Sequence, residues 1–245
     1  MAEETSGSEP TTADPVDPDR LSADVARVLD RLAGGGVAIL PLDVAYAVVA
    51  AREAGIRRIF AAKRRSYDKP SGLFGDWRLS RELHVMDDDR HAMVRTIVQE
   101  EGLPFSVVAP FRADHPLIAG VDPFVLASST KAGTLDMLLN AGQAHDAVAR
   151  QSRERAMPVF GSSANTSLAG SKYRFADIED EVRRAADIHL DHGRSKYANE
   201  AGRSSTIIDF RDFTVIRVGV CFDRLADAFS RRFGVALTMT ERTAR

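Results

Sequence analysis

The sequence is poor in cysteine and has no long hydrophobic run. Cys221 is its only cysteine, which excludes an internal disulfide framework and any zinc site built from several cysteines. No apolar stretch approaches the roughly 18 residues needed to cross a membrane, and the N-terminus lacks the charged-then-apolar pattern of a signal peptide. We therefore expect a protein of the reducing cytoplasm that is neither exported nor embedded in a membrane.

An excess of charge of one sign is also missing. The 33 basic and 35 acidic residues leave a formal net charge of -2, so no global field favours nucleic acid or a membrane surface. A binding site for an anion would have to be a local cluster of cations. The 44% hydrophobic and 28% charged residues are typical of an ordinary soluble globular protein.

The domain organisation follows from where apolar residues are present. Residues 1–19 are rich in Pro, Ser, Thr and acidic residues, which predicts a disordered N-terminal tail. Residues 20–235 contain no internal repeat and no long linker, and residues 236–245 are expected to form a short C-terminal tail. Helical and strand patterns alternate within the central part, which predicts a single α/β domain with a mixed, twisted open sheet flanked by helices.

Apolar spacing and chain breakers predict the elements of this domain. The helical patterns cover residues 21–33, 54–65, 134–156, 175–186 and 222–235. The strand patterns cover residues 105–111, 122–129, 157–163 and 187–191, a pair within 37–51 that meets at Pro41, and a pair within 205–220 that meets at Arg211 and Asp212.

The first candidate site is the turn after the apolar run of residues 157–160. It reads Gly161, Ser162, Ser163, Ala164, Asn165, and its backbone N–H groups, hydroxyls and amide could converge on a phosphate or carboxylate at the end of a strand. The same residue types are also ordinary turn formers. No Gly-Lys-Ser/Thr sequence follows, so this is not a Walker loop.

The second candidate is a run of cations at a predicted helix end. Lys63, Arg64, Arg65 and Lys69 lie within seven positions and could grip a polyphosphate, with arginine supplying bidentate contacts and lysine a point charge. A solvated helix end stabilised by the helix dipole explains the same pattern equally well.

Two weaker candidate sites lie at a predicted corner and on a short predicted strand. Asp43 and Tyr46 lie at the predicted corner between two strands, where they could orient an amine or a hydroxyl, although turn chemistry alone also explains Asp43. His189 and His192 flank a short strand, but such a pair is more typical of solvent-facing residues, so we predict no metal site. Cys221 follows an apolar strand and is expected to act as a small core residue.

Five short segments follow one another along the chain: PLDVAYAV, KRRSYDKPSG, SANTSLAG, STIID and IRVGV. Taken in this order, they resemble the motifs of the YrdC/Sua5 family of threonylcarbamoyl-AMP synthases, and the resemblance runs from about Leu21 to Phe229. It implies a YrdC-like α/β domain with a large basic concave cavity, a fold also described as a double-stranded RNA-binding module.

The resemblance also implies an activity and its residues. Members condense L-threonine, bicarbonate and ATP into threonylcarbamoyl-adenylate, with release of pyrophosphate, for tRNA modification. A Mg²⁺ ion on the ATP phosphates is the expected helper. Carried over by position, the expected catalytic residues are Lys63 and Arg65, the nucleotide-binding residues are Lys69, Ser163, Asn165, Ser205 and Arg217, and the amino-acid pocket holds Asp43 and Tyr46.

The chain departs from the family pattern at the first corner. Leu42 and Val44 occupy the places where members carry two threonines, so the hydroxyls expected to line the amino-acid pocket are absent. This departure supports an alternative hypothesis, in which the protein is a catalytically altered or inactive paralogue that binds nucleotide or double-stranded RNA without turnover.

Overall fold

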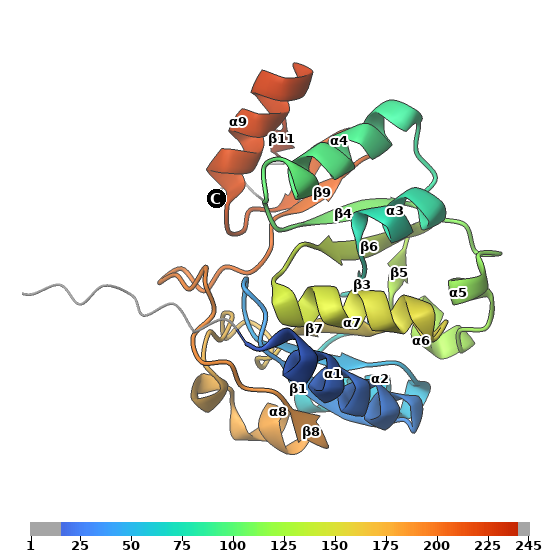
Figure 1. Cartoon of the computed structure of the whole chain (residues 1–245), viewed down its shortest axis with the longest axis vertical. Coiled ribbons are helices and arrows are strands. Elements are labelled where there is room, and N and C mark those ends of the chain that lie inside the picture. Colours follow the sequence, from blue (N-terminus) through green and yellow to red (C-terminus); the bar gives the residue numbers. More distant parts are fainter. Residues whose placement is uncertain (1–15, 240–245) are drawn as a thin grey trace, which may run out of the picture.

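A mixed sheet of eleven strands runs through the part of the chain that this computed structural model describes, residues 16–239 (Figure 1). The strands are β1 (Val37–Leu40), β2 (Ala47–Ala50), β3 (Gly72–Phe74), β4 (Phe105–Pro110), β5 (Thr130–Lys131), β6 (Thr134–Leu139), β7 (Phe160–Ser163), β8 (Ile188–His189), β9 (Ile207–Asp209), β10 (Thr214–Arg217) and β11 (Thr238–Met239). Their spatial order is β11-β10-β9-β4-β6-β3-β7-β2-β1-β8, and β5 pairs with β6. Neighbouring strands are both parallel and antiparallel, as the sequence predicts for a mixed sheet.

Helices connect most of these strands. They are α1 (Pro18–Ala33), α2 (Glu53–Ala62), α3 (Trp77–Leu83), α4 (Asp88–Gln99), α5 (Pro116–Ala119), α6 (Pro123–Ala127), α7 (Gln143–Glu154), α8 (Asp180–Arg184) and α9 (Phe222–Phe233), with one 3₁₀ turn, η1 (Phe175–Asp177). Within residues 16–239, no helix combines the length and the apolar character that a membrane crossing requires.

The first helix shows how the sequence specifies its ends. Asp17 accepts a hydrogen bond from the backbone N–H of Arg20, Pro18 occupies the first turn, and the glycines from Gly34 onward end the helix. The helix therefore begins two residues inside the segment expected to be a disordered tail. The rest of that prediction, residues 1–15, lies outside the described residues, as do residues 240–245 of the predicted C-terminal tail, in which Thr238 and Met239 pair with β10.

One predicted helix is half wrong. Residues 134–156 were expected to form one long helix, but their first six residues form β6, which pairs antiparallel with β4 and parallel with β3. Leu135, Met137 and Leu139 are buried on one face, which is the period of a strand. Asn140 at φ 53° and Gly142 at φ 102° then turn the chain in left-handed conformations before α7 begins.

A second predicted strand, residues 122–129, is the short helix α6. The Asp122 carboxylate accepts from the backbone N–H groups of Phe124 and Val125, and Pro123 stands at the first helical position. These are helix-start signals that outweigh the apolar run after them. The helix predicted over 175–186 is interrupted as well, because η1 and α8 are separated by an extended segment at Ile178.

Alternate residues of the central strands face two different layers. One face packs against α2, α3, α4 and α9, through strand residues such as Val48 and Met137. The other face packs against α1 and α7, through Ala47 and Phe74 among others, and these two helices lie side by side across the sheet in Figure 1. Because α1 and α7 cover only part of that second face, the rest of it is open for a site.

Candidate functional site

A cavity of about 110 Å³ lies on the sheet face that α1 and α7 share. Its lining comes from seven strands and their connections, and comprises Leu42, Val44, Ala45, Tyr46, Ala47, Arg65, Pro70, Gly72, Phe74, Ser106, Asp136, Leu138, Gly161, Ser162, Ser163, Ser204, Ser205, Ile207 and Arg217. Segments that are far apart in the sequence are therefore brought together, and five of the predicted site residues are among them: Tyr46, Arg65, Ser163, Ser205 and Arg217.

Arg65 reaches the cavity from the loop that follows α2. Its Nε donates to the carbonyl of Lys69 at 3.0 Å and its Nη2 donates to the carbonyl of Pro70 at 2.9 Å. Burial and the neighbouring Arg217 lower the pKa of the guanidinium, which still stays charged near neutrality. Since an arginine has five N–H donors, this anchoring positions the group and leaves donors for a ligand.

Arg217 reaches the same cavity from the end of β10. Its Nε and Nη2 donate to the carbonyl of Ser205 at 3.0 and 2.8 Å, and Nη2 also donates to Ser205 Oγ at 3.0 Å. Just after β10, Gly219 packs tightly against the backbone of residues 204–206, and a Cβ at Gly219 would lie 2.2 Å from the carbonyl oxygen of Ser204. Ser205 thus acts first as the anchor of Arg217, while both residues line the cavity.

The turn after β7 is held together from within. Lys63 Nζ donates to the carbonyls of Ser163 and Asn165, the latter at 2.5 Å, and Ser163 Oγ donates to Asn165 Oδ1 at 2.5 Å. Lys63 is 1% exposed, and burial, aided by Arg65, lowers the pKa of its amine to about 7. Of these three residues only Ser163 lines the cavity, so Lys63 and Asn165 lie behind the turn.

Lys69 and Asp43 also lie outside the cavity lining. The Lys69 side chain is exposed and its carbonyl, not its amine, serves the site by holding Arg65. Asp43 lies against the start of α7, where a Cβ at Gly142 would be 2.4 Å from Asp43 Oδ1, and burial raises the pKa of its carboxyl. The flanking Leu42 and Val44 line the cavity instead.

Tyr46 borders the cavity, but its hydroxyl does not face it. The ring belongs to the core layer on the other face of the sheet, and the hydroxyl donates to the Asp191 carboxylate and to the Gly193 carbonyl at 2.8 Å. Burial and Asp191 raise the pKa of this phenol well above its usual value. Tyr46 therefore ties the first corner to the long connection between β8 and β9.

The sequence analysis missed the carboxylate of the cavity, Asp136. It lies on β6 between the buried Leu135 and Met137 and faces the same side as Leu138. Interpreting residues 134–139 as a helix concealed it, because a lone acid stands out only in a strand, where it alternates with apolar residues. The strand period was the signal that could have found it.

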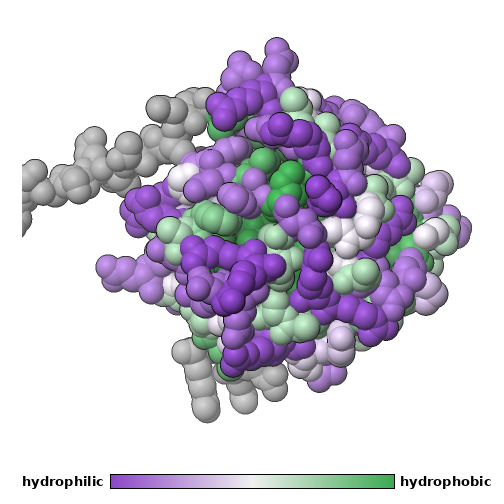
Figure 2. All heavy atoms as spheres, turned by 90° about the horizontal axis from the view of Figure 1, so that it is seen from below, coloured by the Kyte–Doolittle hydropathy of each residue, from purple (hydrophilic) through white to green (hydrophobic). Residues whose placement is uncertain are grey.

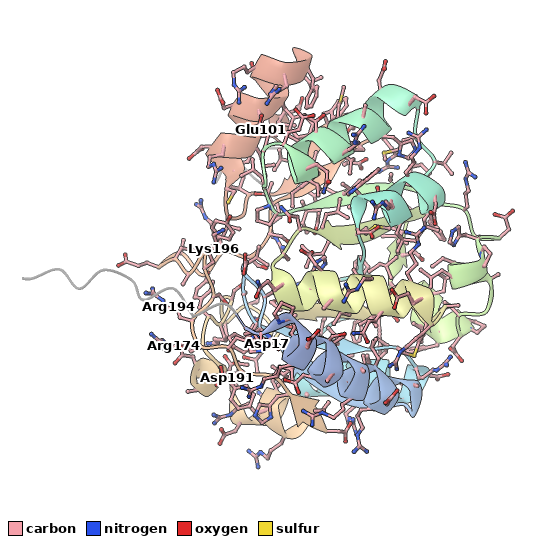
Figure 3. The ribbon with its side chains drawn as sticks, viewed as in Figure 1. Asp17, Glu101, Arg174, Asp191, Arg194 and Lys196 are labelled. Carbon is pink, nitrogen blue, oxygen red and sulfur yellow. The ribbon has the colours of Figure 1, made fainter. Side chains whose placement is uncertain are left out.

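Exposed cations gather beside the first corner. Arg174, Arg194 and Lys196 are exposed and lie on one side of the molecule, Arg174 in the connection between β7 and β8 and the other two in the connection between β8 and β9 (Figure 3). Burial raises the pKa of the Asp43 carboxyl, and the charge of Lys196 offsets part of that rise. Arg174 likewise offsets part of the rise in the pKa of the Tyr46 phenol. The surface seen in Figure 2 is mostly hydrophilic, with hydrophobic atoms gathered in a hollow near its centre.

The described residues contain no group of three or more His, Cys, Asp or Glu side chains that could hold a metal ion. His189 stacks on Phe175, with ring centroids 4.1 Å apart. Cys221 is half-buried at the start of α9, in a left-handed conformation with φ 59°, and packs against both core layers.

Comparison with known proteins gives one family and several similar structures. The Sua5/YciO/YrdC family model, described as telomere recombination, matches residues 30–219. No curated protein matches the sequence at a significant level. The hypothetical protein smu.1377c from Streptococcus mutans UA159 is similar with a TM-score of 0.74 at 20% identity, covering 86% of this chain and 93% of that one.

Two further structures carry ligands. Sua5 from P. abyssi complexed with L-threonine has a TM-score of 0.69 at 16% identity, over 93% of this chain and 61% of that chain. Full-length HypF in the phosphate- and nucleotide-bound form has a TM-score of 0.57 at 13% identity, over 76% of this chain and 27% of that chain. At these identities the likeness establishes the fold, and this chain spans less than two thirds of either protein.

Proposed function

This chain belongs to the Sua5/YciO/YrdC family, and on that premise we propose that it forms a carbamoyl-adenylate from ATP, bicarbonate and an amino acid, which is threonine in the family. Pyrophosphate is released, and the product serves tRNA modification. The observation that supports this proposal is the convergence of Arg65 and Arg217 on one cavity. The L-threonine bound to Sua5 and the nucleotide bound to HypF are consistent with it.

In this proposal the protein acts by positioning and by neutralising charge. Carbonyl groups already hold both guanidinium groups, so they need no reorganisation as charge develops on the phosphates and the carbamate. Ser163 and Ser205 offer hydroxyls to the nucleotide, and Lys63 keeps the Ser163 turn in shape from behind. No covalent nucleophile is required, because aligning the reactants supplies much of the rate.

The residues present do not form a protein-built magnesium site. Asp136 is the only carboxylate that lines the cavity, and the described residues offer no cluster of acids. A Mg²⁺ ion would enter with ATP, held by phosphate oxygens and water, and would supply further neutralisation of phosphate charge.

The test is turnover with a panel of amino acids. Purified protein is incubated with γ-labelled ATP, bicarbonate and each amino acid in turn, and both pyrophosphate and the carbamoyl-adenylate are measured. Arg65→Ala is expected to lower kcat/KM by about 100-fold, because a preorganised donor is lost. Arg64→Ala is the matched control, since that neighbour is exposed and paired with Glu181 at 2.6 Å, and it should stay within about twofold.

The proposal would be contradicted if the rate of pyrophosphate release did not depend on which amino acid is present. It would also be contradicted if kcat/KM of Arg65→Ala equalled that of Arg64→Ala. The competing function is that of a paralogue that binds nucleotide or double-stranded RNA without turnover. The exposed Arg174, Arg194 and Lys196 favour it, since no ion pair within 4 Å engages them among the described residues. RNA binding with a steep salt dependence, together with no turnover for any amino acid, would establish that alternative.

A further inference from the structure

One oxygen of the Asp136 carboxylate, Oδ1, has no protein partner in the cavity. Its Oδ1 is shielded from solvent and accepts no hydrogen bond, although a buried polar atom usually has a partner. Its Oδ2 lies over Gly72, where a Cβ would be 3.3 Å away, so the space beside the carboxylate exists because that position has no side chain. An unsatisfied carboxylate on the wall of a cavity indicates a ligand that donates hydrogen bonds.

The two guanidinium groups of the cavity do not satisfy this carboxylate. Arg217 and Arg65 are near enough to lower the pKa of Asp136, yet neither forms an ion pair with it within 4 Å among the described residues. Backbone carbonyls hold both arginines in place. Burial outweighs these arginines and the Ser106 hydroxyl, and it raises the pKa of Asp136 to about 6. The cavity therefore keeps positive and negative groups apart.

Such a cavity discriminates between classes of ligand. In the part of the cavity beside Asp136, a group that carried only negative charge would meet a like charge, which is unfavourable in a partly desolvated site, whereas phosphates can lie on the side of Arg65 and Arg217. A ligand with both an ammonium group and a carboxylate would match both signs. The enclosed volume of about 110 Å³ is smaller than the several hundred Å³ of pockets that enclose drug-sized ligands, so one small molecule or group fits the enclosed part.

We propose that Asp136 receives the α-ammonium group of a free amino acid, whose carboxylate faces the guanidinium groups of Arg65 and Arg217. This assignment rests on the proposed function, and it names the residue that selects the amino acid within that site. Asp136 replaces the expected Asp43 in this role, because Asp43 lies outside the cavity against the start of α7.

The experiment measures binding separately from turnover. Calorimetry with the full chain ranks the standard amino acids, and the tightest binder is compared with its N-acetyl derivative, which keeps the carboxylate and loses the ammonium. We expect acetylation to weaken binding about 10- to 100-fold, the range of one charge-assisted hydrogen bond. Asp136→Asn should weaken binding of the free amino acid by a similar factor, and it should not weaken binding of the N-acetyl compound, for which a like charge is removed.

Asp43→Asn is the matched control, because it removes a second half-buried carboxylate near the same corner and should change amino-acid binding by less than about twofold. Thermal melting confirms that both variants are folded, and Asp136→Ala gives a second variant if the amide packs poorly. Failure of every amino acid to bind, equal binding of the N-acetyl compound, or a loss confined to Asp43→Asn would overturn the assignment.

The outcome also separates this inference from the proposed function. Amino-acid binding that needs Asp136, without formation of an adenylate, would sustain the inference and refute the enzyme. Turnover that is unaffected by Asp136→Asn would sustain the enzyme and refute the inference.

Discussion

The resemblance assigns Lys63 and Arg65 to catalysis and Arg217 to nucleotide binding, and the structure separates the lysine from the two arginines. Arg65 and Arg217 are each fixed by carbonyl groups while still lining the cavity. Lys63 is only two residues from Arg65, yet its Nζ donates hydrogen bonds to the carbonyls of Ser163 and Asn165. The difference shows that cations close together in the sequence can divide into residues that line the cavity and a residue that holds the backbone of a turn.

The same contrast appears in the two acids that border the site. Asp43 lies at the corner singled out by its sequence, but it is turned toward the start of α7. Asp136 lies in the middle of an apolar strand and faces the cavity. In both comparisons the position in the sequence alone does not decide which residue lines the cavity.

Arg217→Ala tests whether the arginines that line the cavity contribute to turnover. Loss of this guanidinium removes a preorganised donor, so we expect turnover to fall by about 100- to 1000-fold, with the melting temperature little changed. Steady-state kinetics and thermal denaturation measure the two effects. Arg211→Ala is the control on the same hairpin, because Arg211 is exposed and pairs with Asp209 at 2.7 Å. Equal losses in both variants would show that the hairpin, and not the cavity cation, is being disturbed.

Lys63→Met tests the architectural half of the comparison. It leaves the buried carbonyls of Ser163 and Asn165 without their donor, which is expected to lower the free energy of unfolding by about 2 kcal/mol. Denaturant unfolding monitored by circular dichroism measures the change. Lys69→Met makes the same change of charge and length at an exposed side chain and should alter stability by less than about 0.5 kcal/mol. A Lys63→Met protein as stable as the wild type would contradict the architectural role of Lys63.

The smallest expected effect concerns the charge of Asp136. With its pKa at about 6, protonation as the pH falls from 8 to 5 removes a negative charge from the cavity. Sulfate, whose own charge is constant over that range, should then bind on the order of fivefold more tightly. The amine of Lys63 also titrates, near pH 7, so the comparison is between the wild type and Asp136→Asn, which share that group. Identical pH profiles for the two proteins would show that Asp136 does not set the charge of the cavity.

The sequence predicted much of the fold, but it described the site only in part. Where a stripe of apolar residues had clear end signals, as in α1 with its Asp17 cap, the predicted element is confirmed. The errors fell where an apolar run fits two periods: residues 134–139 pair with two strands that are distant in sequence, and no local pattern reveals such a pairing. Because Asp136 lies in that segment, its place in the cavity was hidden as well.

For the site residues, the sequence did not predict the directions in which the side chains point. The resemblance singled out Arg65, Ser163, Ser205 and Arg217, and all four line one cavity. It could not show that Lys63 turns inward, since that depends on two carbonyls about a hundred residues further along the chain. Side-chain direction is decided by the completed sheet.

The order of the strands has a consequence for how the protein reaches its working state. The N-terminal hairpin β1–β2 is flanked by β7 and β8, and β4 pairs with β9, so the sheet is closed by segments more than a hundred residues apart. Pairings of this kind form late and slowly in folding. Since the cavity draws its wall from strands on both sides of these pairings, no early folding intermediate contains it. A ligand of the cavity therefore acts on the fully folded state alone, and binding should raise the free energy of unfolding of the whole domain with the logarithm of ligand concentration, even after the site is saturated.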